Sequence, residues 1–161
     1  MLETFRNSAR SRIVTFSQRY GEDLNRIEEV EYRLEFPIRN NTGITSATIM
    51  GKVDVILRNG GELEVREYKS SEEARTLEEV STQIRLYTAG LRTLGKPVVA
   101  GSVAYLDEAD VKDVKVSEEL ISEAKQNAGK VVERIANGEF EPTPGKSCER
   151  CDQSPICRWR K

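Results

Sequence analysis

The sequence predicts an α/β fold in which a central sheet is flanked by helices. Residues 44–57 and 62–70 show the period-two alternation of strands. In residues 72–94, apolar side chains recur at intervals of three and four, which is typical of a helix packed on a core. The order strand, strand, strand, helix, strand, helix along the chain is that of an α/β core.

Each element has its own local signals. The expected elements, in chain order, are a helix over residues 3–24, strands over 28–38, 44–57 and 62–70, a helix over 72–94, a strand over 98–106 and a helix over 117–137. Gly95 ends the first long helix of the core, and Ser117 and Gly138 begin and end the last one. Residues 139–161 contain prolines and all the cysteines and are expected to be a loop-rich tail.

Length and composition fit one soluble domain over residues 1–161. A hydrophobic content of 37% with 32% charged residues excludes a membrane span and a disordered chain. The net charge of -2 does not indicate a nucleic-acid binder, although residues 157–161 form a local basic patch. Three cysteines and a polar, arginine-containing start without a signal peptide predict a reducing compartment, so we expect a cytoplasmic or nucleoid-associated protein.

Three charged residues, Asp54, Glu67 and Lys69, lie in the two adjacent strands. With Gly60-Gly61 as the hairpin turn, Asp54 falls directly opposite Glu67; with Asn59-Gly60 it falls one diagonal step away. A three-residue loop would instead place Asp54 on the other face. Directly opposed side chains lie roughly 5 Å apart, close enough for both carboxylates to bind one cation.

Charge in a strand that is otherwise apolar is costly unless it is paired or holds a metal. Two acids and a lysine at such a place therefore indicate a cation site with a positive group beside it. The simpler interpretation is that Asp54 pairs with Lys52 or Arg66 on an exposed hairpin, and that Glu67 and Lys69 form the solvated end of a strand.

At these residues the chain resembles a known family. Asp54 followed by Glu67-Tyr68-Lys69 is similar to the motif of the PD-(D/E)XK nucleases, above all the RecB-type domains of helicases and CRISPR-associated exonucleases. Gln83-Ile84-Arg85-Leu86-Tyr87 matches the QxxxY motif of that branch. Cys148, Cys151 and Cys157 match its C-terminal cysteine cluster. The order and spacing agree from about Ile27 to the end of the chain.

The resemblance implies a restriction-endonuclease-like core, a mixed central sheet flanked by helices with a cysteine-containing tail. It also implies that Asp54, Glu67 and the Tyr68 backbone carbonyl hold Mg²⁺ or Mn²⁺. Lys69 would act at the scissile phosphate, while Gln83 and Tyr87 would hold DNA and orient the lysine. From the residues alone, Tyr87 belongs to the apolar stripe of its helix and its default role is core packing.

The chain departs from the family pattern in three ways. Val53 replaces the proline before the first acid, and the sequence has no histidine although many members carry one on an upstream helix. We expect that upstream helix to be missing or shortened. The [4Fe–4S] cluster of the family needs four cysteines, so we expect the cluster in an intact parent protein but not in this chain. Met1 is then expected to be a start codon added to a fragment.

The predicted function is a metal-dependent DNA nuclease domain, forming the C-terminal part of a helicase-nuclease in DNA repair or recombination. Its partners would be DNA, single-stranded above all, and a helicase domain or subunit, with no membrane. The alternative is a catalytically inactive module of the same fold that binds DNA or braces a partner. The three charged residues alone are also compatible with a hydrolase acting on another phosphate ester.

Overall fold

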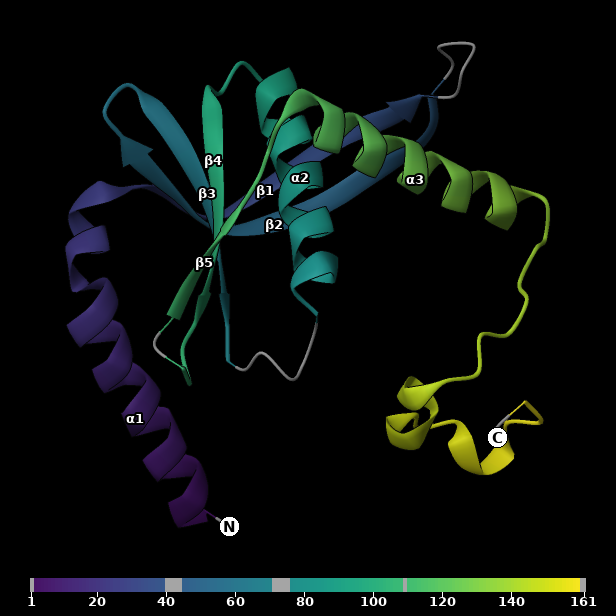
Figure 1. The fold of residues 1–161 in the computed structure, drawn as a ribbon, viewed down its shortest axis with the longest axis horizontal. Coiled ribbons are helices and arrows are strands. Elements are labelled where there is room, and N and C mark those ends of the chain that lie inside the picture. Colours follow the sequence, from purple (N-terminus) through teal and green to yellow (C-terminus); the bar gives the residue numbers. More distant parts are fainter. Residues whose placement is uncertain (1, 40–44, 71–75, 109, 160–161) are drawn as a thin grey trace.

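The computed structural model describes residues 2–39, 45–70, 76–108 and 110–159 (Figure 1). Five strands form one sheet in the order β1 to β5, with bounds β1 Ile27–Arg39, β2 Thr45–Asn59, β3 Glu62–Lys69, β4 Val98–Tyr105 and β5 Asp110–Val114. β3 and β4 are parallel, and the other neighbouring pairs are antiparallel. The predicted α/β class with a mixed sheet is confirmed.

Helices cover both faces of this sheet. The helices are α1 Leu2–Tyr20, α2 Leu77–Thr93 and α3 Glu118–Ala136. α2 is the crossover that joins the parallel strands β3 and β4, and with α3 it packs on one face (Figure 1). α1 is followed by a 3₁₀ helix, η1 (Gly21–Arg26), and lies against the opposite face through the rings of Phe16 and Tyr20, which contact Tyr68.

Local sequence signals explain where the two core helices begin and end. The Thr76 side chain accepts a hydrogen bond from the Glu79 N–H at 3.3 Å, and the Glu79 carboxylate accepts one from the Thr76 N–H at 2.8 Å. This reciprocal cap satisfies two backbone donors at the start of α2. Ser117 caps α3 as predicted, and Gly138, with a φ of 73°, follows its end.

The hydrophobic core lies between the sheet and α2. Its fully or almost fully buried members include Leu34, Phe36, Ile38, Val53, Ile56, Val65, Val80, Ile84, Leu91 and Val103. Gly90 and Gly101 allow close contact between α2 and the sheet, since a Cβ on either would lie within 2.6 Å of a core side chain. This tight packing fixes the position of α2 relative to β1 and β4.

The sequence did not predict β5, which is a short edge strand. Asp110–Val114 pairs only with β4 and carries charges at three of its five positions. Such short, charged edge strands avoid pairing with other chains, but they also lack a strong apolar alternation. The predicted first helix was too long, because the regular α1 ends at Tyr20 and η1 covers the rest.

The alternation predicted for β2 is correct in its first part only. Val53 and Ile56 are three positions apart and would point to opposite faces of a regular strand, but both belong to the core. The alternation is therefore interrupted between them. Val55 and Leu57 are buried as well, on the side of η1. The central part of the sheet is therefore covered on both faces, and Asp54 is half-buried.

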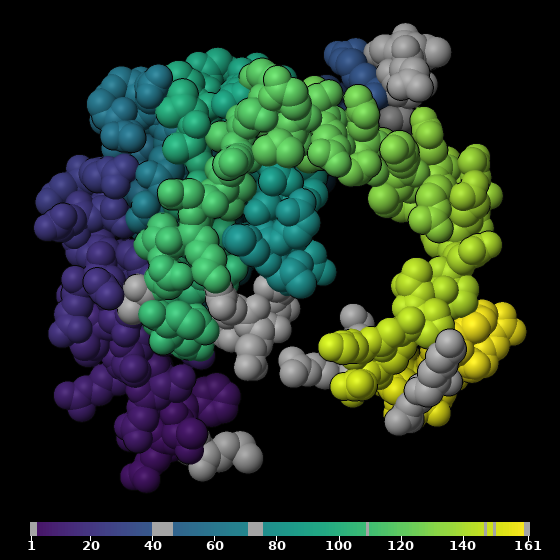
Figure 2. Space-filling model, viewed as in Figure 1, coloured from purple at the N-terminus to yellow at the C-terminus, as the bar shows by residue number. Residues whose placement is uncertain are grey.

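Residues 139–159 form an extended tail with two short 3₁₀ turns, η3 (Lys146–Arg150) and η4 (Ser154–Ile156). Figure 2 shows this tail curving away from α3 around an open gap beside α2. The structure thus agrees with a loop-rich tail, apart from these turns. No helix among the described residues is long and apolar enough to cross a membrane.

Candidate functional site

The hairpin between β2 and β3 places the two predicted acids opposite one another. Asn59 pairs with Glu62 around the turn Gly60-Gly61, in which Gly60 has a φ of 66° that favours glycine. The ladder continues to Val55 opposite Arg66. The ladder ends there, and the same register continued by one position would place Asp54 opposite Glu67. The Gly60-Gly61 turn, the first of the three predicted alternatives, is the observed one.

Hydrogen bonds join these two acids directly to the neighbouring strand. The Tyr68 N–H donates to Oδ2 of Asp54 at 2.9 Å, and the Asp54 N–H donates to Oε1 of Glu67 at 3.4 Å. Each carboxylate is thus oriented by a backbone donor. Tyr68, whose carbonyl was predicted as a third metal ligand, belongs to the same junction.

Glu67 is the centre of this side-chain cluster and is only 1% exposed. Its Oε2 accepts one hydrogen bond from Lys69 Nζ at 2.8 Å and another from Gln83 Nε2 at 3.1 Å. Gln83 Nε2 also donates to the Tyr87 hydroxyl at 2.9 Å. The structure therefore brings together all five side chains that the sequence singled out on β2, β3 and α2.

Burial raises the pKa of Glu67 above its ordinary value of 4.5, the hydrogen bond from Lys69 opposes this rise, and the charge of Asp54 adds to it. Two carboxylates thus share one lysine in a partly desolvated place. A second positive charge would relieve their repulsion. The cluster is consistent with a binding site for a cation.

The donor atoms fit Mg²⁺ or Mn²⁺ better than a softer metal. Within the described residues, Asp54 Oδ1 accepts no hydrogen bond and Oε1 of Glu67 accepts one, so both oxygens have lone pairs to offer. No group of three or more Cys, Asp or Glu side chains gathers as a metal site in the described part of the chain. Mg²⁺ binds through one or two carboxylates and completes its shell with water and phosphate oxygens, as this pair would require.

The amide of Gln83 is held on one side only. Its Oε1 is buried and has no hydrogen-bond partner among the described residues, whereas its Nε2 serves both Glu67 and Tyr87. An unpaired buried acceptor costs free energy. The Gln83 Oε1 atom is therefore suited to accept a hydrogen bond from a water molecule or from a group of a bound ligand.

A glycine that the sequence analysis did not select shapes this site. A Cβ on Gly51 would lie 2.4 Å from Cε1 of Tyr87. The bare backbone of β2 therefore provides the space in which the Tyr87 ring lies while its hydroxyl meets Gln83. The pairing of a strand glycine with a helix aromatic produces no periodic pattern, so sequence alone gave no signal for it.

A second cluster of charges lies on the other face of β3 and was also missed. Arg66 donates to Oε1 of Glu64 at 2.7 Å and to Oγ of Ser102 at 2.9 Å, and it forms an ion pair with Asp23 of η1. Arg26 reaches Oε2 of Glu64 at 3.1 Å. We call these five residues the Arg66 cluster. Its signal in the sequence is that charged residues occupy both faces of β3.

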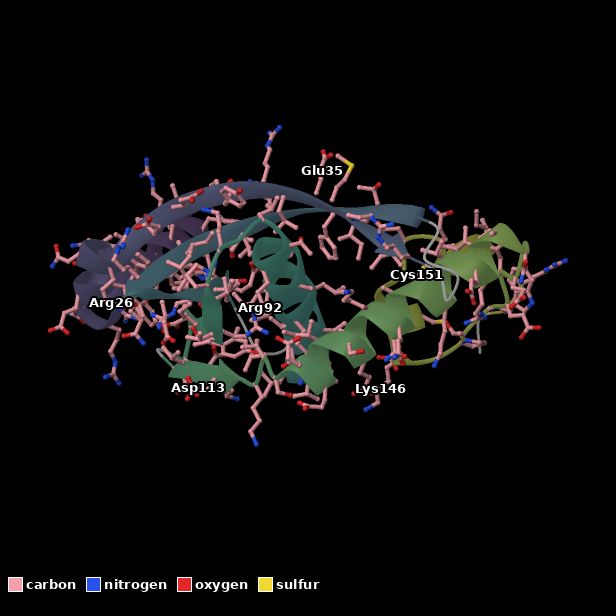
Figure 3. All side chains as sticks on the ribbon, turned by 90° about the horizontal axis from the view of Figure 1, so that it is seen from above. Arg26, Glu35, Arg92, Asp113, Lys146 and Cys151 are labelled. Atoms are coloured by element: carbon pink, nitrogen blue, oxygen red, sulfur yellow. The ribbon has the colours of Figure 1, made fainter. Side chains whose placement is uncertain are left out.

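The three cysteines are free thiols in the tail. Cys148 and Cys157 are half-buried and Cys151 is exposed. The Gly145 N–H donates to Sγ of Cys148 at 3.5 Å. In Figure 3, Cys151 and Arg26 of the Arg66 cluster lie in opposite halves of the molecule along its long axis. The predicted iron–sulfur role of the cysteines remains a prediction.

Comparisons with known proteins agree with this geometry. The family model of the PD-(D/E)XK nuclease superfamily matches residues 2–158. Among solved structures, the protein in "Crystal structure of SSO0001" is similar, with a TM-score of 0.56 and 19% sequence identity over 83% of this chain. The match covers 61% of that protein, and at this identity it shows a shared fold alone.

No curated protein matches the chain. The family model spans nearly the whole described structure, including the hairpin with Asp54 and Glu67, α2 and the tail. The chain belongs to the PD-(D/E)XK nuclease superfamily.

Proposed function

We propose that this chain is a metal-dependent nuclease domain that hydrolyses phosphodiester bonds in DNA. The observation that carries the proposal is the meeting of Asp54, Glu67 and Lys69 at one hydrogen-bonded junction beside α2. One buried and one half-buried acid with a single lysine carry excess negative charge, and a divalent cation would supply the missing positive charge and bind a phosphate. Membership of a nuclease superfamily supports the same conclusion.

Asp54 and Glu67 would hold Mg²⁺ or Mn²⁺, with the Tyr68 carbonyl as a third oxygen. Once bound, the ion would supply Lewis-acid activation of the phosphate and of the attacking water. The chain's own contribution is to orient both carboxylates through backbone N–H donors, so that little reorganisation is needed at the moment of reaction.

Lys69 would stabilise the negative charge that develops on the phosphate. Its ammonium is held 2.8 Å from Glu67 Oε2 and its side chain is 21% exposed, so one side of the group stays accessible to substrate. Gln83 and Tyr87 would fix the orientation of Glu67 from α2. We assign both residues a positioning role, because the hydrogen bonds recorded for them lead to Glu67.

The test is Mn²⁺-dependent degradation of labelled single-stranded DNA by this chain, with Asp54→Ala as the control. Cleavage that requires Mn²⁺ and is lost in the control is the expected result. Mn²⁺ binding that is unchanged by both Asp54→Ala and Glu67→Ala would contradict the metal assignment.

The competing proposal is a catalytically inactive module that binds DNA or braces a partner. The observation in its favour is the absence of histidine from the sequence, since many related nucleases use one. DNA binding by the native chain without any Mn²⁺-dependent cleavage would favour this alternative.

Finer features of the proposal concern the parent protein. We propose a RecB-type domain attached to a helicase, acting in DNA repair or recombination in the cytoplasm or nucleoid. In that parent, Cys148, Cys151 and Cys157 would hold a [4Fe–4S] cluster with a cysteine from outside this chain. Iron analysis of the anaerobically purified parent tests this: a parent without iron and without a fourth cysteine would leave three ordinary thiols.

A further inference from the structure

The N-terminal half of α1 forms an exposed and positively charged arm. The helix carries Arg6, Arg10, Arg12 and Arg19 but Glu3 as its single acid, in a chain whose net charge is -2. Residues 3–11 are exposed except for the half-buried Ser8. Positive charge is thus concentrated on a helix that has little contact with the rest of the protein over this half.

Two arginines of this arm form no ion pair with any residue that the structure describes. Arg12 forms an ion pair with Asp107 at 2.7 Å, which uses its charge within the fold. Among the described residues, Arg6 and Arg10 form no ion pair, and both are exposed. They are four positions apart, so they share a face of the helix and lie about 6 Å apart along its axis.

The base of the arm lies behind β3, on the face of the sheet opposite to the candidate active site. The Phe16 ring lies 5.5 Å from that of Tyr68, the residue between Glu67 and Lys69. Arg12 pairs with Asp107. The residue before Asp107, Leu106, donates its N–H to the Lys69 carbonyl at 2.8 Å. The middle of α1 is therefore held next to the backbone of the predicted catalytic lysine.

From this point the arm extends outward past the sheet. Figure 1 shows α1 running alongside the sheet and continuing beyond the turn between β4 and β5, and Figure 2 shows its first half projecting from the body. DNA that extends from the site past this end of the sheet would reach the helix segment that carries Arg6 and Arg10.

We propose that the exposed half of α1 is a nucleic-acid-binding arm, in which Arg6 and Arg10 contact phosphates of the DNA strand that flanks the cleavage position. The inference rests on the proposed nuclease function for the identity of the ligand. The argument for DNA over a protein partner is charge complementarity. Two exposed arginines that form no ion pair within the described residues share one face of a helix that packs behind the strand of the proposed site, and such a face matches a polyanion.

The test measures the salt dependence of binding to a labelled oligothymidylate in chelator-containing buffer, where no metal-dependent cleavage occurs. For single-stranded DNA the slope of log Kobs against log salt concentration is about -0.7 per phosphate contacted. Arg6→Gln/Arg10→Gln should therefore make the slope less negative by about 1.4, because two contacts are lost. Arg6→Lys/Arg10→Lys should keep the native slope, because counterion release depends on charge.

A matched control removes two positive charges elsewhere. Arg33 on β1 and Lys115 after β5 are both exposed, and Arg33→Gln/Lys115→Gln changes the net charge by the same amount as the arm variant. The control should leave the slope unchanged. Equal slopes for the arm variant and the native chain would overturn the proposal and assign this face of α1 to a protein partner.

The outcome also separates this inference from the nuclease proposal. A changed slope in a chain that shows no Mn²⁺-dependent cleavage would support the arm and contradict the catalytic function. Mn²⁺-dependent cleavage by the native chain together with an unchanged slope in the arm variant would support the nuclease function and contradict the binding role of the arm. Circular dichroism of the arm and control variants checks that α1 remains helical. A changed slope in Arg6→Lys/Arg10→Lys, which keeps both charges, would show that the effect has a cause other than charge.

Discussion

The two faces of β3 carry two charged clusters with opposite electrostatic character. On the face toward α2, Lys69 pairs with Glu67 beside the second acid, Asp54, and the pKa of Glu67 is raised mainly by burial. On the face toward η1, burial alone would raise the pKa of Glu64, but the hydrogen bond from Ser102 and the charge of Arg66 outweigh it and lower the pKa below 4.5.

This difference separates a cluster suited to binding from one suited to stability. In the Arg66 cluster, two guanidinium groups face two acids, and both oxygens of Glu64 accept hydrogen bonds. The cluster around Glu67 has more negative than positive charge, and it contains the buried Oε1 of Gln83, which has no hydrogen-bond partner in the part of the chain that the structure describes. A site that binds a cation and a phosphate keeps unpaired polar groups for these ligands. A structural cluster stabilises the fold most when every polar group is paired.

The largest expected effect is on activity at the Glu67 face. Lys69→Ala should lower the rate of DNA cleavage by about 10²–10³-fold, because a preorganised positive group at the phosphate is lost. Mn²⁺ affinity should stay close to native, since both carboxylates remain. Single-turnover cleavage and Mn²⁺ titration measure the two quantities. Cleavage at the native rate would show that Lys69 is a surface residue and would remove the main support for the nuclease proposal.

The largest expected effect on stability lies on the opposite face. Arg66→Ala leaves Glu64 and Asp23 buried without their main cation, so the free energy of unfolding should fall by about 3–5 kcal/mol. Urea denaturation measures this change. Arg12→Ala, which breaks the more exposed pair with Asp107, is the control and should lower the free energy of unfolding far less, because solvent screens an exposed pair. A similar decrease in the free energy of unfolding in the two variants would mean that the Arg66 cluster stabilises the fold no more than an exposed ion pair does.

A smaller effect is expected from the glycine that accommodates Tyr87. Gly51→Ala should destabilise the fold by about 1–3 kcal/mol through overpacking and should also lower cleavage by displacing the Tyr87–Gln83 contact. Gly101→Ala is the matched control, because its Cβ would lie 2.5 Å from Cγ2 of Ile84, in the core. It should destabilise to a similar degree without a comparable loss of activity.

A double variant separates packing from catalysis. In Gly51→Ala/Tyr87→Leu the ring is gone, so most of the stability lost in Gly51→Ala should return while cleavage stays low. Recovery of cleavage along with stability would show that the Tyr87 hydroxyl is unimportant and that Gly51 matters for packing alone.

The candidate site could be predicted from sequence because its parts are local. Asp54 and Glu67 are joined by a hairpin whose glycine turn fixes the register, and Lys69 follows on the same face. Gln83 and Tyr87 share a helix face through their spacing of four. Only the packing of α2 on β3 was needed to unite the two groups, and the order of elements implied that packing.

The Arg66 cluster could not be predicted in the same way. Its members come from η1, β3 and β4, and Ser102 is 36 positions from Arg66. No turn or periodicity determines which distant charges meet, so the sequence shows only that β3 is charged on both faces. β5 was missed for a different reason: its pairing with β4 depends on the neighbouring strand more than on its own alternation.

The smallest expected effect is a pair of opposite pH dependences in metal-free buffer. The folded-state pKa of Glu67 is raised, so the folded protein binds more protons than the unfolded chain, and the Glu67 contribution to the free energy of unfolding falls as the pH rises from 4.5 through that pKa. The folded-state pKa of Glu64 is lowered, so its contribution is present above pH 4.5 and is lost as the pH falls through that pKa. Urea denaturation at a series of pH values measures both trends. Glu67→Gln should remove the decline above pH 4.5, and Glu64→Gln should flatten the loss below it. If the two variants changed the pH profile in the same direction, the two faces of β3 would not differ in electrostatic character, and the contrast between a binding cluster and a structural one would fail.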